Sequence, residues 1–137
     1  MMITHKEIDL VRKVQQLGKK IFQQTGQSPR HTVVAGILSK SGKIYFGVNC
    51  DSVHGTCAEV VAYANAILKN DYQLKTIVSI SVRRDGIDGI IEPCGNCRQI
   101  LFENIPSLNV VLNIENKLQK INIRELLPYA YDNKYRA

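Results

Sequence analysis

Hydrophobic positions along the first third of the chain predict one helix and two strands. Between Thr4 and Gln24 the apolar residues recur every three or four positions, and Thr4 with Glu7 forms a capping-box start for a helix. Two runs of β-forming residues follow, His31–Ser39 and Lys43–Asn49, separated by a Lys-Ser-Gly turn. We therefore expect these runs to pair as antiparallel strands.

In the rest of the chain, predicted helices and strands continue to alternate. A helical segment opened by Cys57 is apolar on nearly every side from Val60 to Leu68, so it must be covered all round, and a second subunit is the favoured cover. The further predicted elements are a strand at Thr76–Val82, a helix at Cys94–Glu103 introduced by Pro93, strands at Asn109–Ile114 and Leu118–Ile123, and a helical turn at Arg124–Leu127. This order predicts an α/β fold, a three-layer sandwich with a mixed five-stranded sheet flanked by helices.

Size and composition narrow the class of protein. The 137 residues, of which 45% are hydrophobic and 22% charged, predict a single globular domain over residues 1–137. The net charge is +6, but the basic residues are scattered in short pairs, which favours a solvated surface over a nucleic-acid groove. No apolar run is long enough to cross a membrane, and the charged N-terminus does not resemble a signal peptide, so we expect a cytoplasmic protein.

Three cysteines form the strongest chemical signal. Cys94 and Cys97 stand three residues apart at the start of a predicted helix, and Cys57 stands at the start of another. Thiols stay reduced in the cytoplasm, and helix N-termini favour thiolates, so this set predicts a zinc site. A redox dithiol is the competitor for Cys94 and Cys97, but it leaves Cys57 and Glu59 unexplained.

The fourth zinc ligand separates two hypotheses. If Cys50 completes the set, the site is closed and structural, which would suit a zinc-stabilised, non-catalytic binding module. If the position is left to water, zinc makes that water reactive, and Glu59, two residues after Cys57, is placed to move its protons. Arg98 follows Cys97, and it is either a donor to a thiolate or a solvated helix residue.

Four stretches of the chain together resemble the cytidine deaminase family, and most closely its blasticidin-S deaminase branch. The stretches are Gly42–Asn49, Cys57–Glu59, Pro93–Gln99 and Arg124–Pro128. This resemblance implies that Cys57, Cys94 and Cys97 bind zinc and that Glu59 transfers protons. It also implies substrate contacts from Thr32, Asn49 and the Ala58 main chain, and from Tyr131 toward a neighbouring subunit of a homotetramer.

The resemblance is weaker around the expected substrate. The family carries Asn-x-Glu in a longer loop, whereas this chain reads Asn49-Cys50-Asp51-Ser52 and reaches Cys57 sooner. His31 stands where an aromatic residue is usual, and with Asp51 or His54 it could form a different polar pocket. The motifs of the zinc site are therefore better matched than those of the substrate site.

Together these features predict a zinc-dependent hydrolytic deaminase. Its expected substrate is a free cytosine-type nucleoside or analogue, such as cytidine, deoxycytidine or blasticidin S, and its products are the uracil form and ammonia. The alternatives are the closed four-cysteine module and deamination of bases in nucleic acid. The small size and the lack of an aromatic groove disfavour the latter.

Overall fold

The computed structural model describes residues 2–24 and 29–132, and its helices and strands follow the predicted order. The helices are α1 (His5–Gln24), α2 (Ala58–Leu68) and α3 (Gly95–Asn104), with short 3-10 helices η1 (Gly86–Gly89) and η2 (Ile123–Leu126). The strands are β1 (Val33–Ser39), β2 (Ile44–Val48), β3 (Leu74–Ser81), β4 (Ile90–Ile91), β5 (Asn109–Ile114) and β6 (Lys117–Asn122). None of the helices in the described ranges is long and apolar enough to cross a bilayer.

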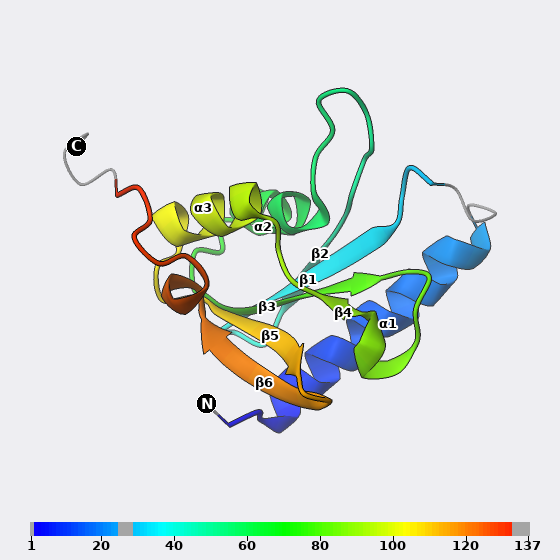
Figure 1. Cartoon of the computed structure of the whole chain (residues 1–137), viewed down its shortest axis with the longest axis horizontal. Coiled ribbons are helices and arrows are strands. Elements are labelled where there is room, and N and C mark those ends of the chain that lie inside the picture. The colour runs from blue at the N-terminus through cyan, green and yellow to red at the C-terminus, as the bar shows by residue number, and fades with distance from the viewer. Residues whose placement is uncertain (1, 25–28, 133–137) are drawn as a thin grey trace.

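The strands form one mixed sheet between two layers of helix. Their order is β2-β1-β3-β5-β6, and only β3 and β5 run parallel along this path. Helix α1 covers one face of the sheet, and α2 and α3 lie side by side over the other (Figure 1). The predicted three-layer α/β sandwich with a mixed sheet is therefore confirmed.

The structure adds a sixth strand to the five that were predicted. Strand β4 has two residues, which pair with Ser79 and Ile80 of β3. The sequence predicts only a loop here, because two residues are too few to show an alternating pattern. The position of β4 matters because Pro93 and the predicted zinc ligand Cys94 follow it directly, so the pairing with β3 sets where they lie.

Each face of the sheet has its own hydrophobic core. The core beneath α1 is built from aliphatic side chains such as Leu10, Val14 and Val78. The core beneath α2 and α3 includes Ile77 and Leu101. Both cores exclude water, so each helical layer is held to the sheet by buried apolar surface.

Small residues bring α2 unusually close to the sheet. The residues of α2 that are fully buried against the sheet include Ala58, Ala62 and Ala66. On β2, a Cβ atom added to Gly47 would lie 2.3 Å from the carbonyl oxygen of Ala58 and 2.3 Å from the nitrogen of Ala62. The first turn of α2 therefore rests on the bare backbone of Gly47.

A buried ion pair joins the first helix to the last strand. Lys120 Nζ lies 2.5 Å from Glu7 Oε1, and the side chains of Lys120 and Glu7 are 14% and 1% exposed. Burial on its own raises the pKa of Glu7, but the hydrogen bond from Lys120 and its charge bring that pKa below the usual value. The charged pair therefore stabilises the contact between α1 and β6 at neutral pH.

We expect Gly47→Ala to lower the free energy of unfolding by at least about 2 kcal/mol, because its methyl group must push the α2 backbone away from β2. Gly18→Ala is the control, since the added Cβ would meet Val82 at 3.7 Å, an ordinary contact. It should be neutral or stabilising by up to about 1 kcal/mol, because alanine favours the helix. Urea unfolding of both variants measures the difference, and equal effects would contradict the close approach at Gly47.

We expect Glu7→Gln to destabilise the protein by about 3 kcal/mol at pH 7, because it leaves the Lys120 ammonium without its partner. The pKa of Glu7 is depressed in the folded state, so this contribution is present above the unfolded pKa and is lost as pH falls through the folded one. Denaturant unfolding from pH 7 down to pH 3 should therefore show the gap between wild type and variant closing.

The matched control for this measurement is Asp9→Asn, which breaks the Asp9–Lys13 pair. That pair joins atoms 3.1 Å apart on side chains that are 52% and 47% exposed. Exposed pairs of this kind contribute under about 0.5 kcal/mol. A Glu7→Gln effect as small as that of the control would contradict a stabilising buried pair.

Candidate active site

A cavity of about 350 Å³ opens where the β2–α2 loop, the start of α2 and the β4–α3 connection meet. Its walls combine apolar, polar and thiol groups. The lining residues are Val33, Asn49, Cys50, Asp51, Ser52, Gly55, Thr56, Cys57, Ala58, Glu59, Ile91, Glu92 and Cys94. The candidate residues from two distant parts of the sequence therefore share one cavity.

Three thiols meet at the wall of this cavity, which Cys57 and Cys94 line. The sulfur atoms of Cys57, Cys94 and Cys97 all lie within 4.8 Å of one another, and Cys57 and Cys94 are 3.6 Å apart. Cys57 is the N-cap of α2 and Cys94 is the N-cap of α3, while Cys97 lies in the first turn of α3. The predicted convergence of two helix N-termini on one set of sulfurs is thus present.

The environment of the thiols favours a cation between them. Burial raises the pKa of Cys57 and of Cys97, and the nearby Glu59 charge raises both further. Burial also opposes the Cys94 thiolate, but hydrogen bonds, including those from the main-chain N–H groups of Cys97 and Asn96, lower the pKa of Cys94. Three adjacent thiolates repel one another unless a positive ion lies among them.

The donor set fits zinc. Three soft sulfur ligands suit this ion, and tetrahedral Zn–S bonds of about 2.3 Å place sulfurs about 3.8 Å apart. The Cys57–Cys94 separation of 3.6 Å is close to that spacing, and all three sulfurs lie within 4.8 Å of one another. Cys57, Cys94 and Cys97 would therefore hold zinc without a large rearrangement.

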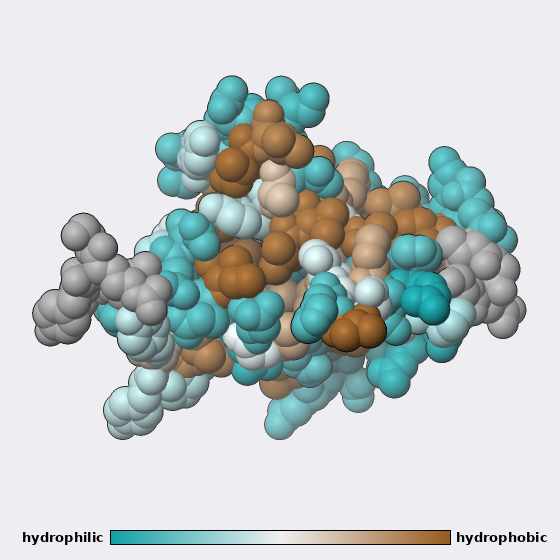
Figure 2. Space-filling view, turned by 90° about the horizontal axis from the view of Figure 1, so that it is seen from above, coloured by the Kyte–Doolittle hydropathy of each residue, from teal (hydrophilic) through white to brown (hydrophobic). Residues whose placement is uncertain are grey.

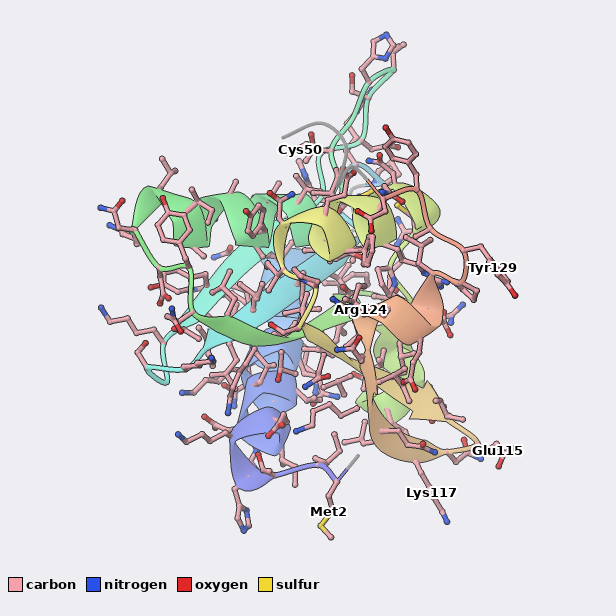
Figure 3. The ribbon with its side chains drawn as sticks, turned by 90° about the vertical axis from the view of Figure 1, so that its left-hand side faces the viewer. Met2, Cys50, Glu115, Lys117, Arg124 and Tyr129 are labelled. Atoms are coloured by element: carbon pink, nitrogen blue, oxygen red, sulfur yellow. The ribbon has the colours of Figure 1, made fainter. Side chains whose placement is uncertain are left out.

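Cys50 lies outside the group of three thiols. It is exposed, and its backbone pairs with Thr56 through N–H···O bonds of 3.0 and 3.1 Å. This pairing closes the base of the loop between β2 and α2, which projects from the body of the protein (Figures 1 and 3). Among the described residues, the group that could hold a metal contains three cysteines and not the four of the closed alternative.

Glu59 is the buried carboxyl group of the cavity. It lies in the first turn of α2 and is 4% exposed. Burial raises the pKa of Glu59, while hydrogen bonds from its own main chain and from Ser79 lower it in part. A carboxyl group with a raised pKa, placed beside a metal site, is suited to accept and return a proton.

The Asn49 side chain is hydrogen-bonded to Thr32 and Val33 at the start of β1. Asn49 Oδ1 accepts hydrogen bonds from the main-chain N–H groups of Thr32 at 2.7 Å and Val33 at 2.9 Å. Asn49 Nδ2 donates to Thr32 Oγ1 at 3.3 Å, and His31 Nδ1 lies 2.8 Å from the carbonyl oxygen of Asn49. Asn49 lines the cavity and Thr32 does not, so these bonds hold the Asn49 side chain in the cavity wall.

Arg98 and Tyr131 both make hydrogen bonds to groups other than the three thiols. Arg98 donates to the carbonyl oxygens of Pro93 at 2.8 Å and Leu126 at 2.9 Å. These bonds make Arg98 a brace between η2 and the turn that carries Cys94. Tyr131 is 57% exposed, and its carbonyl oxygen accepts a bond from Gln99 Nε2 at 2.8 Å.

The structure also adds residues that the sequence analysis did not identify. Ser79 lies in the buried interior of β3 and contacts Glu59, and Ile91 and Glu92 line the cavity. Ser79 could have been noticed in the sequence, because it is a polar residue inside the apolar run Thr76–Val82. Ile91 and Glu92 gave no signal, because their place depends on the pairing of β4 with β3.

An α/β fold in which two helix N-termini gather three thiols beside a buried glutamate defines a class of protein, the zinc-dependent hydrolases that act on aminated rings. The family model described as the cytidine and deoxycytidylate deaminase zinc-binding region matches residues 8–112. The chain therefore belongs to the cytidine deaminase family. It is an enzyme of the zinc-dependent deaminase type, as the sequence analysis predicted.

Two relatives illustrate the similarity in sequence. Blasticidin-S deaminase from Bacillus cereus is 27% identical over 136 residues, which cover 94% of each chain. Cytidine deaminase from Halalkalibacterium halodurans is 33% identical over 107 residues, covering 74% of this chain and 78% of the relative.

Solved structures show the same fold. Cytidine deaminase from Bacillus anthracis aligns with a TM-score of 0.74 at 22% identity, covering 95% of this chain and 92% of the other. Cytidine deaminase from Burkholderia pseudomallei aligns with a TM-score of 0.69 at 24% identity, covering 94% and 100%.

We expect Cys94→Ser to lose most of the zinc that the wild-type protein binds, because it removes one of the three sulfur ligands. Cys94 is exposed, so the variant should keep its fold. Cys50→Ser is the control and should retain about one zinc ion per chain. Atomic emission spectroscopy of purified proteins, with circular dichroism to verify folding, makes the comparison. Loss of zinc from Cys50→Ser would support a four-cysteine site instead.

Proposed function

We propose that this protein is a zinc-dependent hydrolase that deaminates a free cytosine-type nucleoside or nucleoside analogue. Cytidine, deoxycytidine and blasticidin S are the substrates to test. One observation carries the proposal: Cys57 and Cys94 of the three-thiol group line the same cavity as the buried Glu59, and this cavity is large enough for a small aminated ring. The products are the uracil form of the ring and ammonia.

The reaction balances with water as the only co-substrate. The oxygen of water bonds to the ring carbon that carries the amine, and the bond from that carbon to nitrogen breaks. Zinc bound by the three cysteines would supply a water molecule of lowered pKa. Glu59 takes a proton from this water, passes it to the ring nitrogen, and delivers the second proton to the departing amine, which leaves as ammonia.

Other residues of the cavity position the ring. The main chain of Ala58 lines the cavity next to Glu59, where it can hydrogen-bond the polar edge of the ring. The side chain of Asn49 uses its oxygen to hold β1, and one N–H remains for the substrate. Thr32 acts through Asn49, and Arg98 keeps the Cys94 turn in place.

The exposed face of α2 and α3 supports a homo-oligomer, which we propose to be a tetramer. The alanines of α2 face the sheet, so its larger apolar residues are left half-buried or exposed, with Leu68 79% exposed. Figure 2 shows apolar side chains gathered on this face. In such an assembly Tyr131 is the residue expected to approach a neighbouring subunit.

We also propose a domain organisation and a cellular compartment for the enzyme. Residues 1–137 act as a single domain in the cytoplasm, where reduced thiols can hold zinc. The closed four-cysteine module is the less supported alternative, because Cys50 stands apart from the other three sulfurs.

We expect Glu59→Gln to reduce turnover by about 10²- to 10⁴-fold, because glutamine cannot move the protons. Zinc content and melting temperature should stay close to those of the wild type, since the shape of the side chain is retained. The assay follows the change in ultraviolet absorbance of cytidine, deoxycytidine and blasticidin S. Glu103→Gln, outside the cavity, is the control. Full activity of Glu59→Gln would contradict the assignment, and an inactive wild type with zinc bound would favour a binding module.

A further inference from the structure

A second cavity, of about 600 Å³, lies between the β1–β2 turn and the loop that joins α2 to β3. Its volume falls within the range of about 300–1,000 Å³ that small-molecule sites usually have. One wall is formed by residues of β1, β2 and their turn, and the other by residues 69–73. The second cavity shares no lining residue with the cavity of the thiols, so it is a separate feature of the surface.

Helix α2 separates the two cavities. Cys57 and Ala58, at the start of the helix, line the thiol cavity, whereas Lys69, directly after its last residue, lines the second cavity. With a rise of about 1.5 Å per residue, the 11 residues of α2 span about 16 Å. The chain enters α2 from the projecting loop and leaves it toward β3 (Figure 1). The second cavity is therefore about one helix length away from the thiols.

Hydrogen bonds tie the two walls of the second cavity together. The main-chain N–H of Lys40 and the hydroxyl of Ser39 donate to the carbonyl oxygen of Gln73 at 2.7 and 3.2 Å. The hydroxyl of Tyr45 donates to Asp71 Oδ2 at 2.8 Å, and the main-chain N–H of Gln73 donates to Asp71 Oδ1 at 3.1 Å. These bonds join segments that are distant in the sequence, so the cavity keeps its shape without a ligand.

Three lysines make the second cavity positive. Lys40, Lys43 and Lys69 line it, and all three are exposed. None of the ion pairs formed among the described residues involves these lysines. The carboxylate in the lining is Asp71, whose two oxygens already accept hydrogen bonds from the cavity wall. The C-terminal end of α2 adds about half a negative charge. The lysines outweigh both, so the cavity attracts an anion.

Amide and aromatic side chains complete the lining. Asn70 and Gln73 are exposed, and each side chain carries two N–H donors. Tyr72 is 64% exposed, so most of its ring is open to contact. Nucleic-acid bases stack on aromatic rings of this kind, and lysine binds phosphate as a compact charge. The lining therefore combines groups for phosphates with a flat surface for a base.

We propose that the second cavity binds a nucleoside polyphosphate, with Lys40, Lys43 and Lys69 on the phosphates and Tyr72 on the base. A polyphosphate carries several negative charges on adjacent groups, which matches three lysines better than a single carboxylate does. This is a binding site in addition to the proposed deaminase site, and it requires no chemical step.

Calorimetry of the zinc-loaded protein with three probes tests the assignment. The probes are adenosine triphosphate, adenosine and tripolyphosphate, and the base is adenine because the thiol cavity is expected to take a cytosine-type ring. We expect adenosine to bind at least about tenfold more weakly than the triphosphate, because it lacks the charged groups. Tripolyphosphate should bind about fivefold more weakly, because it lacks the base. Affinity for the triphosphate should fall with added salt, since the lysines are exposed.

The double variant Lys40→Gln, Lys43→Gln should weaken binding of adenosine triphosphate at least about tenfold, because it removes two of the three charges. Its matched control is Lys6→Gln, Lys20→Gln, which removes two exposed lysines of α1 that do not line the cavity and should keep the wild-type affinity. Glu59→Gln should also bind the triphosphate as tightly as the wild type, because Glu59 lines the other cavity.

The variant Tyr72→Leu separates the base from the phosphates. It should weaken adenosine triphosphate about fivefold and leave the affinity for tripolyphosphate unchanged. Urea unfolding of each variant verifies that the fold is retained.

Equal affinity of the wild type and the lysine double variant for adenosine triphosphate would overturn the inference. Binding of a single-stranded RNA at concentrations where the free nucleotide does not bind would also overturn it, and would assign the lysines to nucleic acid instead. The lysine and tyrosine substitutions lie outside the thiol cavity, so either result leaves the proposed deaminase function as it stands.

Discussion

Three thiols within 4.8 Å of one another form an arrangement that the protein must hold against its own electrostatics. Sulfur anions repel, and burial raises the cost of charging them. The fold meets this cost by pointing the positive ends of two helices, α2 and α3, at the same small volume. A divalent cation completes the balance. The relative placement of these two helices is therefore the constraint on which the site depends.

Several contacts away from the cavity serve that placement. Gly47 allows the first turn of α2 to lie directly on β2, which brings Cys57 and Glu59 to the sheet. Strand β4 aligns the approach to Cys94 by pairing with β3, and Arg98 ties the Pro93 carbonyl to η2. Each contact acts on backbone, so the thiols and the glutamate are positioned by rigid elements and not by loops.

The distribution of charge differs between the cavity and the chain as a whole. The surface carries the excess of lysine and arginine, while the cavity concentrates carboxylates and thiols. At the thiols, the positive ends of two helices offset part of the negative charge, and zinc would offset more of it when bound. The cavity therefore combines thiols, carboxylates and helix N-termini in a single arrangement of charge.

Much of the architecture could be read from local patterns. Periodicity of apolar residues predicts the order of the main helices and five of the strands, because each buries one face along its length. The spacing of Cys94 and Cys97, and the place of Cys57 and Glu59 at a helix start, predict the metal and proton chemistry, because side chains one turn apart on a helix share a side. These features can be predicted from the sequence because each depends only on residues that are close together in it.

Features that join distant segments required the folded chain. Cys50 has the same chemistry as the three clustered cysteines, yet it lies outside their group, with its backbone paired to Thr56. Arg98 stands next to a thiol in the sequence, yet it bonds to carbonyl oxygens of Pro93 and Leu126. Asp51 and Glu92 meet at one cavity because a two-residue strand pairs with β3. Side-chain type specifies what a group can do, whereas long-range backbone pairing sets which groups it meets.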